Sequence, residues 1–353
     1  MSNFADMSGV ALTFDDVQIL PCYSEIKNRD EVNVETQYTR KYRIRVPLIA
    51  APMDTVCGVN MALSMAQLGG VGVLHRFLTT REQFENVKSV TLFAEAHGLA
   101  DYPISAAIGV INDWEDRAEM LLKAGVKVLV LDVAHGHHVH VKRALEQLTR
   151  MKNEFEFDIV AGSIATHDAA EALEEWGADA LRVGVGGGSV CETRIRTGIG
   201  LPQLQSVIET ASSVSIPVIS DGGIRYPGDA AKALAAGADS VMIGSLFAGT
   251  TEAPGEIFVA GTWPDDRSMK VYRGLASATT KLKYAGAASH VEGASKLVES
   301  RGPVSHIVKD IIDGITSSMS YVGAANLEEF RTKSRFIQVT PSGLAEAFPH
   351  GLK

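Results

Sequence analysis

The residue with the clearest capacity for chemistry is Cys191, a cysteine that closely follows a run of glycines. A short apolar stretch, residues 180–185, leads into three successive glycines at 186–188, and Thr193 and Arg194 stand just beyond the cysteine. Glycine allows positive φ angles and close approach of the backbone, so such a loop can surround a ligand or an ion with its amides and carbonyls. A thiol held in that loop could act as a nucleophile.

The other two cysteines, Cys22 and Cys57, lack such neighbours. A lone cysteine is more often an inert packed residue than a catalytic one, and we interpret both of them in that way. For Cys191 we favour a catalytic role instead. A glycine triplet beside a strand costs conformational entropy, and its presence indicates that a ligand or another part of the chain approaches the backbone closely.

Two further loops have the composition of an anion site. Gly222-Gly223 comes shortly before Pro227, a good first-turn residue, and Gly244-Ser245 directly precedes another apolar stretch. Both pairs place backbone amides near helix starts, where unpaired N–H groups and the helix dipole favour an anion. Tight turns between strand and helix would explain either loop alone, but the two together favour a phosphate site.

Asp221 adjoins the first of these loops, and its carboxylate could accept hydrogen bonds from two ribose hydroxyls. Capping of the following helix is the alternative role for this side chain. The two phosphate loops and this carboxylate indicate a nucleoside monophosphate whose base faces Cys191, where the sulfur could attack an electrophilic carbon.

A histidine-rich stretch, His135-Gly-His-His-Val-His140, suggests a metal site at first sight. The stretch has no cysteines or carboxylates nearby at the spacing typical of a metal site. Histidines at the start of a loop between a strand and a helix are more often surface residues than metal ligands. Asp132, just before the stretch, is the better functional candidate.

Composition excludes several classes of protein. The chain has 353 residues, is 46% hydrophobic and carries a net charge of -9 without a long basic run, which argues against a nucleic-acid surface. Three scattered cysteines do not make a disulfide framework, and the first residues lack a signal-peptide pattern. No apolar run reaches the length needed to span a bilayer. We therefore expect a soluble, cytoplasmic protein with a small-molecule ligand and no membrane partner.

Eight short apolar runs alternate with stretches rich in Ala, Leu, Glu and Lys. The runs cover residues 46–53, 71–74, 104–109, 127–132, 158–162, 180–185, 217–220 and 240–243. The helix-like stretches cover residues 60–68, 114–124, 141–153, 168–176, 202–211 and 227–236. Continuous apolar strands, each followed by a crossover helix, predict a parallel sheet, and eight of them predict a closed (β/α)₈ TIM barrel.

The catalytic candidates all follow strands of this expected barrel. Asp132 follows the fourth strand, Cys191 the sixth, Asp221 the seventh and Gly244 the eighth. Since active sites of such barrels lie at the carboxyl ends of the strands, these residues should share one rim.

The segments outside the barrel pattern are also assigned. Residues 12–21 are expected to form an extended N-terminal arm, and residues 35–46 a β-prone connection. Residues 252–303, after the eighth strand, are expected to form a β-like excursion with a mobile loop. A final helix at 307–319 and a polar tail complete a single domain spanning residues 1–353.

Several separate motifs, in order along nearly the whole chain, resemble those of the inosine monophosphate dehydrogenase and guanosine monophosphate reductase superfamily. These motifs lie at residues 12–17, 51–55, 186–194, 220–224, 243–249 and 320–324. The resemblance implies a cysteine that forms a thioimidate at purine C2, and a hydride transfer at the same carbon.

Two features of the sequence resemble the reductase branch. The dehydrogenase carries an Arg-Tyr pair on a mobile flap, whereas no such pair stands between Tyr284 and Glu292. The usual dehydrogenase also has a tandem regulatory module after the second strand, where only a helix-like stretch, roughly residues 81–98, is present. The resemblance therefore implies an NADPH-dependent GMP reductase, which converts GMP to IMP and ammonia.

The same resemblance implies the site residues. The catalytic residues would be Cys191 as nucleophile, with Thr193 and Glu292 handling protons on the departing amine. GMP would contact Ser189, Asp221, Gly222, Gly223, Gly244, Ser245, Tyr272, Gly274 and Gly293. The dinucleotide would contact Asp132, Val133, Ala134, Val185 and Gly186, together with Tyr321, Val322, Gly323 and Ala324 of a neighbouring subunit in a homotetramer. A potassium ion would bind carbonyls of Gly186, Gly188 and Cys191.

Four positions depart from the reductase pattern. Gly187 replaces a proline usual in the cysteine loop and should loosen it, while Ser163 and Ala276 stand where Asn and Ser are common. Arg273 is more typical of the dehydrogenase. Two alternatives therefore remain: an IMP dehydrogenase without the regulatory module, converting IMP to XMP with NAD, and a catalytically silent regulator that binds purine nucleotides.

Overall fold

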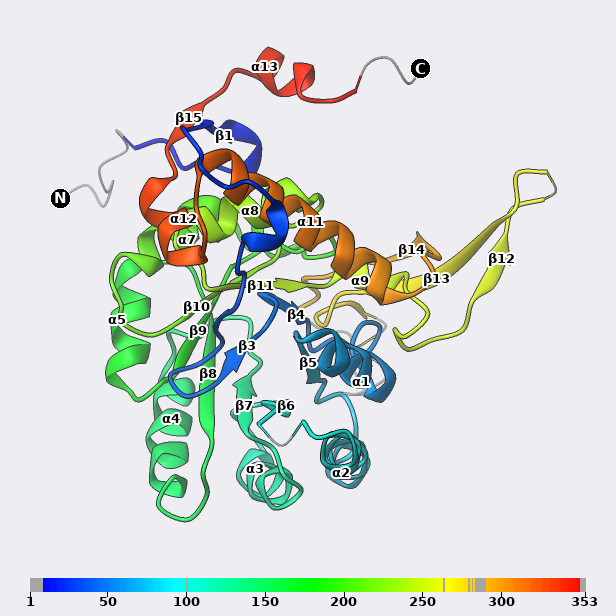
Figure 1. The fold of residues 1–353 in the computed structure, drawn as a ribbon. Coiled ribbons are helices and arrows are strands. Elements are labelled where there is room, and N and C mark those ends of the chain that lie inside the picture. The colour runs from blue at the N-terminus through cyan, green and yellow to red at the C-terminus, as the bar shows by residue number, and fades with distance from the viewer. Residues whose placement is uncertain are drawn as a thin grey trace.

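The eight apolar runs form a closed, parallel, eight-stranded barrel in the computed structural model, which describes residues 9–99, 101–262, 264–278, 280, 282 and 290–349. The strands are β4 (Leu48–Ala50), β5 (Val71–Leu74), β6 (Ser105–Ile108), β7 (Val128–Leu131), β8 (Asp158–Ile164), β9 (Ala180–Val183), β10 (Val218–Asp221) and β11 (Ser240–Ile243). Nearly every residue of these strands is buried, because side chains fill the barrel interior and helices cover its outside. The predicted single-domain (β/α)₈ fold is confirmed (Figure 1).

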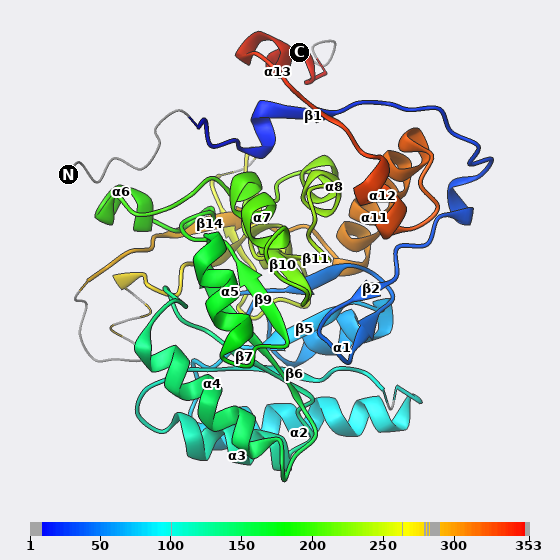
Figure 2. The same cartoon turned by 90° about the vertical axis from the view of Figure 1, so that its left-hand side faces the viewer.

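Helices return the chain from one barrel strand to the next, α11 follows the last barrel strand, and together they cover the outside of the barrel (Figure 2). They are α1 (Val59–Leu68), α2 (Thr80–Ala96), α3 (Trp114–Lys123), α4 (Val139–Met151), α5 (His167–Glu175), α7 (Gln203–Ala211), α8 (Pro227–Ala235) and α11 (Val304–Val322). Each buries one apolar face; in α4 this face consists of Val141, Ala144, Leu145 and Leu148, at the spacing of a helix that packs on a sheet. None of the helices in the described ranges combines the length and apolarity that crossing a bilayer requires.

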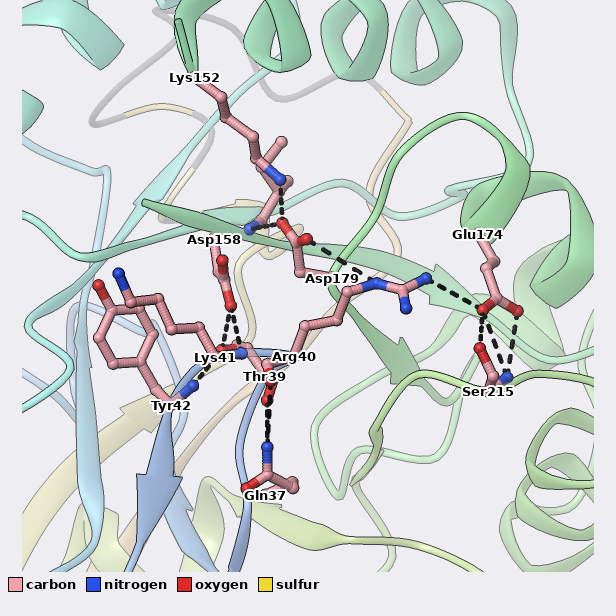
Figure 3. A network of polar contacts seen from close by, with 11 residues as sticks. Gln37, Thr39, Arg40, Lys41, Tyr42, Lys152, Asp158, Glu174, Asp179 and Ser215 are labelled. Atoms are coloured by element: carbon pink, nitrogen blue, oxygen red, sulfur yellow. Dashed lines mark hydrogen bonds and ion pairs between the residues drawn. The ribbon is translucent and has the colours of Figure 1, made fainter. Parts of the chain in front are cut away.

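A hairpin of β2 (Thr36–Gln37) and β3 (Arg43–Ile44) contacts the end of the barrel where strands begin, through the polar network shown in Figure 3. Asp158, the first residue of β8, accepts hydrogen bonds from the Thr39 hydroxyl at 2.6 Å and the Lys41 amide at 2.9 Å. Asp179, just before β9, accepts bonds from Lys152 at 2.5 Å and from the Ile159 amide at 2.7 Å. The buried carboxylates therefore join the hairpin and α4 to the bottom of the barrel, away from the catalytic candidates.

Replacing Asp158 by alanine is expected to lower the free energy of unfolding by about 2–4 kcal/mol, because the buried Thr39 hydroxyl and the Lys41 amide would lose their acceptor. Urea unfolding followed by circular dichroism measures the change. The matched control is Glu156→Gln, which removes an ion pair to Lys41 from a side chain that is 73% exposed, and should change little. Equal unfolding midpoints for the two variants would show that the Asp158 contacts do not stabilise the barrel.

A three-stranded antiparallel sheet projects from the barrel after the eighth strand (Figure 1). Its strands are β12 (Phe258–Ala260), β13 (Arg267–Arg273) and β14 (Ser295–Glu299), and the short helix α9 (Ser245–Ala248) precedes it. The β-like excursion is therefore present. Much of the expected mobile loop, residues 281 and 283–289, lies outside the described residues.

The expectation of a merely polar C-terminal tail is wrong. The tail forms α12 (Leu327–Lys333), β15 (Phe336–Gln338) and α13 (Pro341–Glu346). Strand β15 pairs antiparallel with β1 (Val17–Ile19) of the N-terminal arm. In that arm, β1 directly follows the 3₁₀ turn η1 (Phe14–Asp16). Figure 1 shows the arm and tail together over one side of the barrel. The tail folds because Phe330 is fully buried and the arm offers a strand edge to β15.

Candidate active site

A large cavity of about 1040 Å³ opens at the end of the barrel where the carboxyl ends of the strands meet. Its volume lies at the upper end of the range for small-molecule sites. Loops after β7, β9, β10 and β11 contribute to its wall, so the fold brings Asp132, Cys191, Asp221 and Gly244 to one cavity.

Three of the residues lining the cavity form a continuous hydrogen-bonded chain. Cys191 is exposed, and its Sγ lies 3.2 Å from the Thr193 hydroxyl oxygen. That hydroxyl in turn donates to Oε2 of Glu292 at 2.9 Å, although the two residues are 99 positions apart. A thiol, a hydroxyl and a carboxyl in contact can move a proton to or from a group bound at the sulfur.

Backbone hydrogen bonds hold Glu292 against the cysteine loop. The Glu292 amide donates to Ala276 at 3.1 Å, and its carbonyl accepts from the Glu192 amide at 2.7 Å. Two residues further on, Ala294 donates to Val190 at 2.8 Å. Because the main chain makes these contacts, side-chain changes in the Cys191–Thr193–Glu292 chain should leave the loop in place.

The cysteine loop packs closely on Gln203, a residue of α7 that the sequence interpretation did not single out. Gln203 is buried and donates from Nε2 to Val183 at 2.8 Å and to the Ser220 hydroxyl at 3.1 Å. A β-carbon at Gly187 would lie 2.9 Å from Gln203 Oε1, so glycine permits the loop to pack this closely here. Glycine at 187 thus has a packing role.

The predicted nucleotide residues all line the cavity: Ser189, Asp221, Gly222, Gly223, Gly244, Ser245, Tyr272, Gly274 and Gly293. Gly222 and Gly223 have φ angles of 96° and 80°, which favour glycine. The expectation of unpaired amides at the start of α8 is wrong for Arg225 and Tyr226, because both donate to the Asp229 carboxylate. Asp229, rather than Asp221, therefore caps this helix, and an anion would have to bind the glycine loops themselves.

A chain of four charged side chains crosses the cavity floor. Arg182 donates from Nε to Asp221 at 2.7 Å and from Nη1 to Asp132 at 2.9 Å. Arg76 completes the chain, with Nε 3.1 Å from the second oxygen of Asp132. Asp132 and Asp221 are thus both paired, and Arg182 joins the predicted dinucleotide side of the cavity to the predicted GMP side.

Arg182 is the central charge of this chain and only 8% exposed. Burial alone would lower the pKa of its guanidinium, but the charges of Asp221 and Asp132 outweigh burial and raise the pKa above its usual value. Arg182 therefore stays charged; it pairs with Asp221 and is one of the two arginines that pair with Asp132.

Replacing Arg182 by methionine is expected to lower the free energy of unfolding by about 3–5 kcal/mol, because two carboxylates would be left without their shared partner in a largely buried site. Denaturation midpoints in urea measure this. Arg267→Met is the control, since Arg267 pairs with Glu299 at a site where both side chains are well exposed, and about 0–1 kcal/mol is expected there. Adding Asp132→Asn and Asp221→Asn to Arg182→Met removes the unpaired carboxylate charges and should restore part of the lost free energy of unfolding. A triple variant no more stable than Arg182→Met would show that the unpaired charges do not cause the loss.

The predicted dinucleotide residues divide into two groups. Asp132, Val133, Ala134, Val185 and Gly186 line the cavity, beside Arg76, Phe77 and Trp114. Arg76 lies two residues after the end of the second barrel strand, β5, a position from which the sequence could have indicated it.

The second group, Tyr321, Val322, Gly323 and Ala324, lies at the end of α11 and does not line the cavity of its own chain. Tyr321 is 63% exposed, whereas Val322 and Ala324 are buried within the same chain. Contact of Tyr321, Val322, Gly323 and Ala324 with the site of a neighbouring subunit stays a prediction, and Tyr321 has the most exposed side chain for it.

The histidine stretch takes part in local structure. His138 precedes α4, and its ring accepts a hydrogen bond from the His140 amide at 3.1 Å. In the described part of the chain, no three His, Cys, Asp or Glu side chains are grouped so that they could hold a metal ion.

Comparisons with known proteins agree with this architecture. Residues 11–350 match the family model of the IMP dehydrogenase / GMP reductase domain. An inosine-5'-monophosphate dehydrogenase of Cryptosporidium parvum is 37% identical over 395 positions, which cover 98% of this chain and 96% of the relative. The corresponding enzyme of Nitrosopumilus maritimus is 32% identical over 472 positions, covering 96% of this chain and 98% of the relative.

Among solved structures, a GMP reductase from Trypanosoma brucei in complex with guanosine 5'-monophosphate superposes with a TM-score of 0.90 at 29% identity, and each chain is fully covered. The family match over nearly the whole length, the shared barrel and the cavity at its mouth lead to one conclusion. The chain belongs to the IMP dehydrogenase / GMP reductase family of oxidoreductases, which act on purine nucleotides with a nicotinamide cofactor.

Proposed function

We propose that the protein is an NADPH-dependent GMP reductase, which converts GMP to IMP and ammonia. The observation that carries the proposal is the hydrogen-bonded chain from Cys191 through Thr193 to Glu292. An amino group is a poor leaving group unless its nitrogen is protonated so that it departs as ammonia, and a carboxyl that reaches the sulfur through a hydroxyl is suited to deliver that proton.

In this reaction the Cys191 sulfur attacks purine C2, and the bond from C2 to the exocyclic amine breaks. Thr193 and Glu292 pass protons to the amine, which leaves as ammonia, while a thioimidate remains on the cysteine. NADPH, when bound, supplies the hydride that C2 receives as the sulfur departs, and the product is IMP.

The residues on the dinucleotide side fit such a cofactor. Beyond Cys191 the cavity is lined by Val133, Ala134 and the ring of Phe77, with the Arg76 guanidinium 4.9 Å from that ring. Apolar walls beside a cation suit a flat heteroaromatic ring joined to phosphates. Carbonyls of Gly186, Gly188 and Cys191 would hold a potassium ion, and the Gly188 carbonyl also accepts the Cys191 amide at 3.0 Å.

The dehydrogenase is the second candidate, and two observations favour it. The two sequence relatives described above are named IMP dehydrogenases. Arg273, the residue typical of that branch, forms an ion pair with Asp54 at 2.6 Å beside the nucleotide loops. Chain length does not separate the branches: the alignment with the Cryptosporidium parvum relative is only 395 positions long, against 472 for that from Nitrosopumilus maritimus.

A catalytically silent nucleotide-binding regulator is the third candidate. The departures at Gly187, Ser163 and Ala276 motivate it, but an uninterrupted Cys191–Thr193–Glu292 chain argues for chemistry. We further propose a cytoplasmic homotetramer in which Tyr321 of the partner subunit completes the dinucleotide site.

One spectrophotometric experiment decides among these candidates. The purified protein is assayed at 340 nm with GMP plus NADPH or NADH, and with IMP plus NAD⁺ or NADP⁺. The reductase predicts oxidation of NADPH only with GMP. Formation of NADH from IMP would establish the dehydrogenase instead, and nucleotide binding without turnover in any combination would establish the regulator.

A further inference from the structure

The nucleotide site raises a question of charge. A phosphate monoester carries nearly two negative charges at pH 7, since its second pKa is about 6. The predicted phosphate contacts are glycine amides and the hydroxyls of Ser189, Ser245 and Tyr272, all of which are neutral, and the whole chain has a net charge of -9. A dianion here would gain from a nearby cation.

The arginines that line the cavity are already engaged. Arg76 and Arg182 pair with Asp132, and Arg182 also pairs with Asp221. Three more arginines line the cavity. Arg117 pairs with Asp113, and Arg225 pairs with Asp15 and Asp229. Arg194 donates hydrogen bonds to the carbonyls of Val185 and Leu201. Four of the five arginines therefore already pair with a carboxylate, and the fifth with two carbonyls.

Lys296 lies just outside the lining of this cavity and contacts two residues that line it, Ser189 and Tyr272. It lies on β14 directly opposite Tyr272 of β13, and its Nζ is 5.7 Å from the centre of the Tyr272 ring. Its hydrogen-bond partner is the Ser189 hydroxyl, at a long 3.4 Å. Among the described residues no carboxylate forms an ion pair with Lys296, so its charge is not neutralised by the protein there.

Tyr272 connects Lys296 to the second glycine loop. The ring is 3% exposed, and its hydroxyl lies 2.8 Å from the position that a β-carbon would occupy on Gly244. Burial raises the pKa of Tyr272 to about 12, so the hydroxyl keeps its proton and can donate. The ammonium of Lys296, the hydroxyls of Ser189 and Tyr272, and the Gly244-Ser245 loop therefore form one continuous surface.

We propose that Lys296 binds the 5'-phosphate of the purine nucleotide and supplies the positive charge that the glycine loops lack. The proposal rests on the nucleotide site of the proposed function, and it holds for GMP and IMP alike. It also assigns a role to the sheet of β12, β13 and β14: β14 carries the cation, and β13 carries the tyrosine beneath it. Specificity for a nucleotide over a nucleoside would depend in part on this sheet.

The test measures binding without turnover. Isothermal titration calorimetry of Lys296→Gln against the wild type is expected to show about tenfold weaker binding of GMP and IMP, with guanosine and inosine binding unchanged. Lys296→Arg keeps the charge and should stay close to the wild type. The matched control is Lys309→Gln, which removes an equal charge from an exposed ion pair with Asp313 on α11 and should change neither ligand class.

Two results would overturn the proposal. Unchanged affinity of Lys296→Gln for both monophosphates would show that the ammonium does not contact the phosphate. An equal loss for nucleosides and nucleotides would show that Lys296 acts on the sheet rather than on the phosphate. Since calorimetry needs no catalysis, a wild-type protein that binds both nucleotides but turns over neither would refute the proposed reductase activity and still test Lys296.

Discussion

Replacing Cys191 by alanine is expected to abolish turnover of GMP, by at least about 10⁴-fold in kcat, while GMP binding changes little. In the proposed reaction the Cys191 sulfur forms the covalent bond, and neither Cys22 nor Cys57 lines the cavity. The loop should keep its shape, because the Cys191 amide bonds to the Gly188 carbonyl through the main chain. Steady-state assays and calorimetry with GMP measure the two effects separately.

Cys22→Ala provides the control for this experiment. Cys22 is partly exposed on the N-terminal arm, where its amide bonds to the Tyr321 carbonyl, so its thiol can be removed without touching the cavity. Activity should stay at the wild-type level. More than a tenth of wild-type activity in Cys191→Ala would exclude the sulfur as the nucleophile.

Replacing Glu292 by glutamine is expected to lower kcat for GMP by about 10²–10⁴-fold with a small change in KM. The amide keeps the size of the side chain and can still accept the hydrogen bond from Thr193, but it cannot deliver a proton. Main-chain bonds to Ala276 and Glu192 should hold the segment in place. The measurement is a full kinetic analysis of the variant with GMP and NADPH.

The neighbouring glutamate supplies the matched control. Glu192 is hydrogen-bonded through its amide to the Glu292 carbonyl, but its side chain pairs with Arg196 at 2.9 Å. Glu192→Gln should therefore keep most of the activity. Thr193→Val should behave like Glu292→Gln, and the double variant should lose little more than either single one if the residues act as a unit. Fully additive losses would mean that Thr193 and Glu292 act independently.

The barrel was predictable because its signals are local. Short apolar runs separated by helix-like stretches occur throughout the core of the chain, and each predicted strand overlaps a barrel strand of the structure. The tail was missed for the opposite reason: β15 is stabilised by pairing with β1, more than three hundred residues earlier, and three-residue strands show no period of their own.

The sequence by itself determined the barrel, the glycine loops and the position of Cys191 on the rim that follows β9, because strand order dictates where each loop emerges. The resemblance added Glu292, but only the tertiary structure decided that it reaches Thr193 at 2.9 Å. The same holds for Arg182 between two carboxylates and for Lys296 beside Ser189, 107 positions away. Contacts of this kind depend on how separate loops pack over the barrel mouth, and a periodic pattern along the chain records only which face of an element is buried.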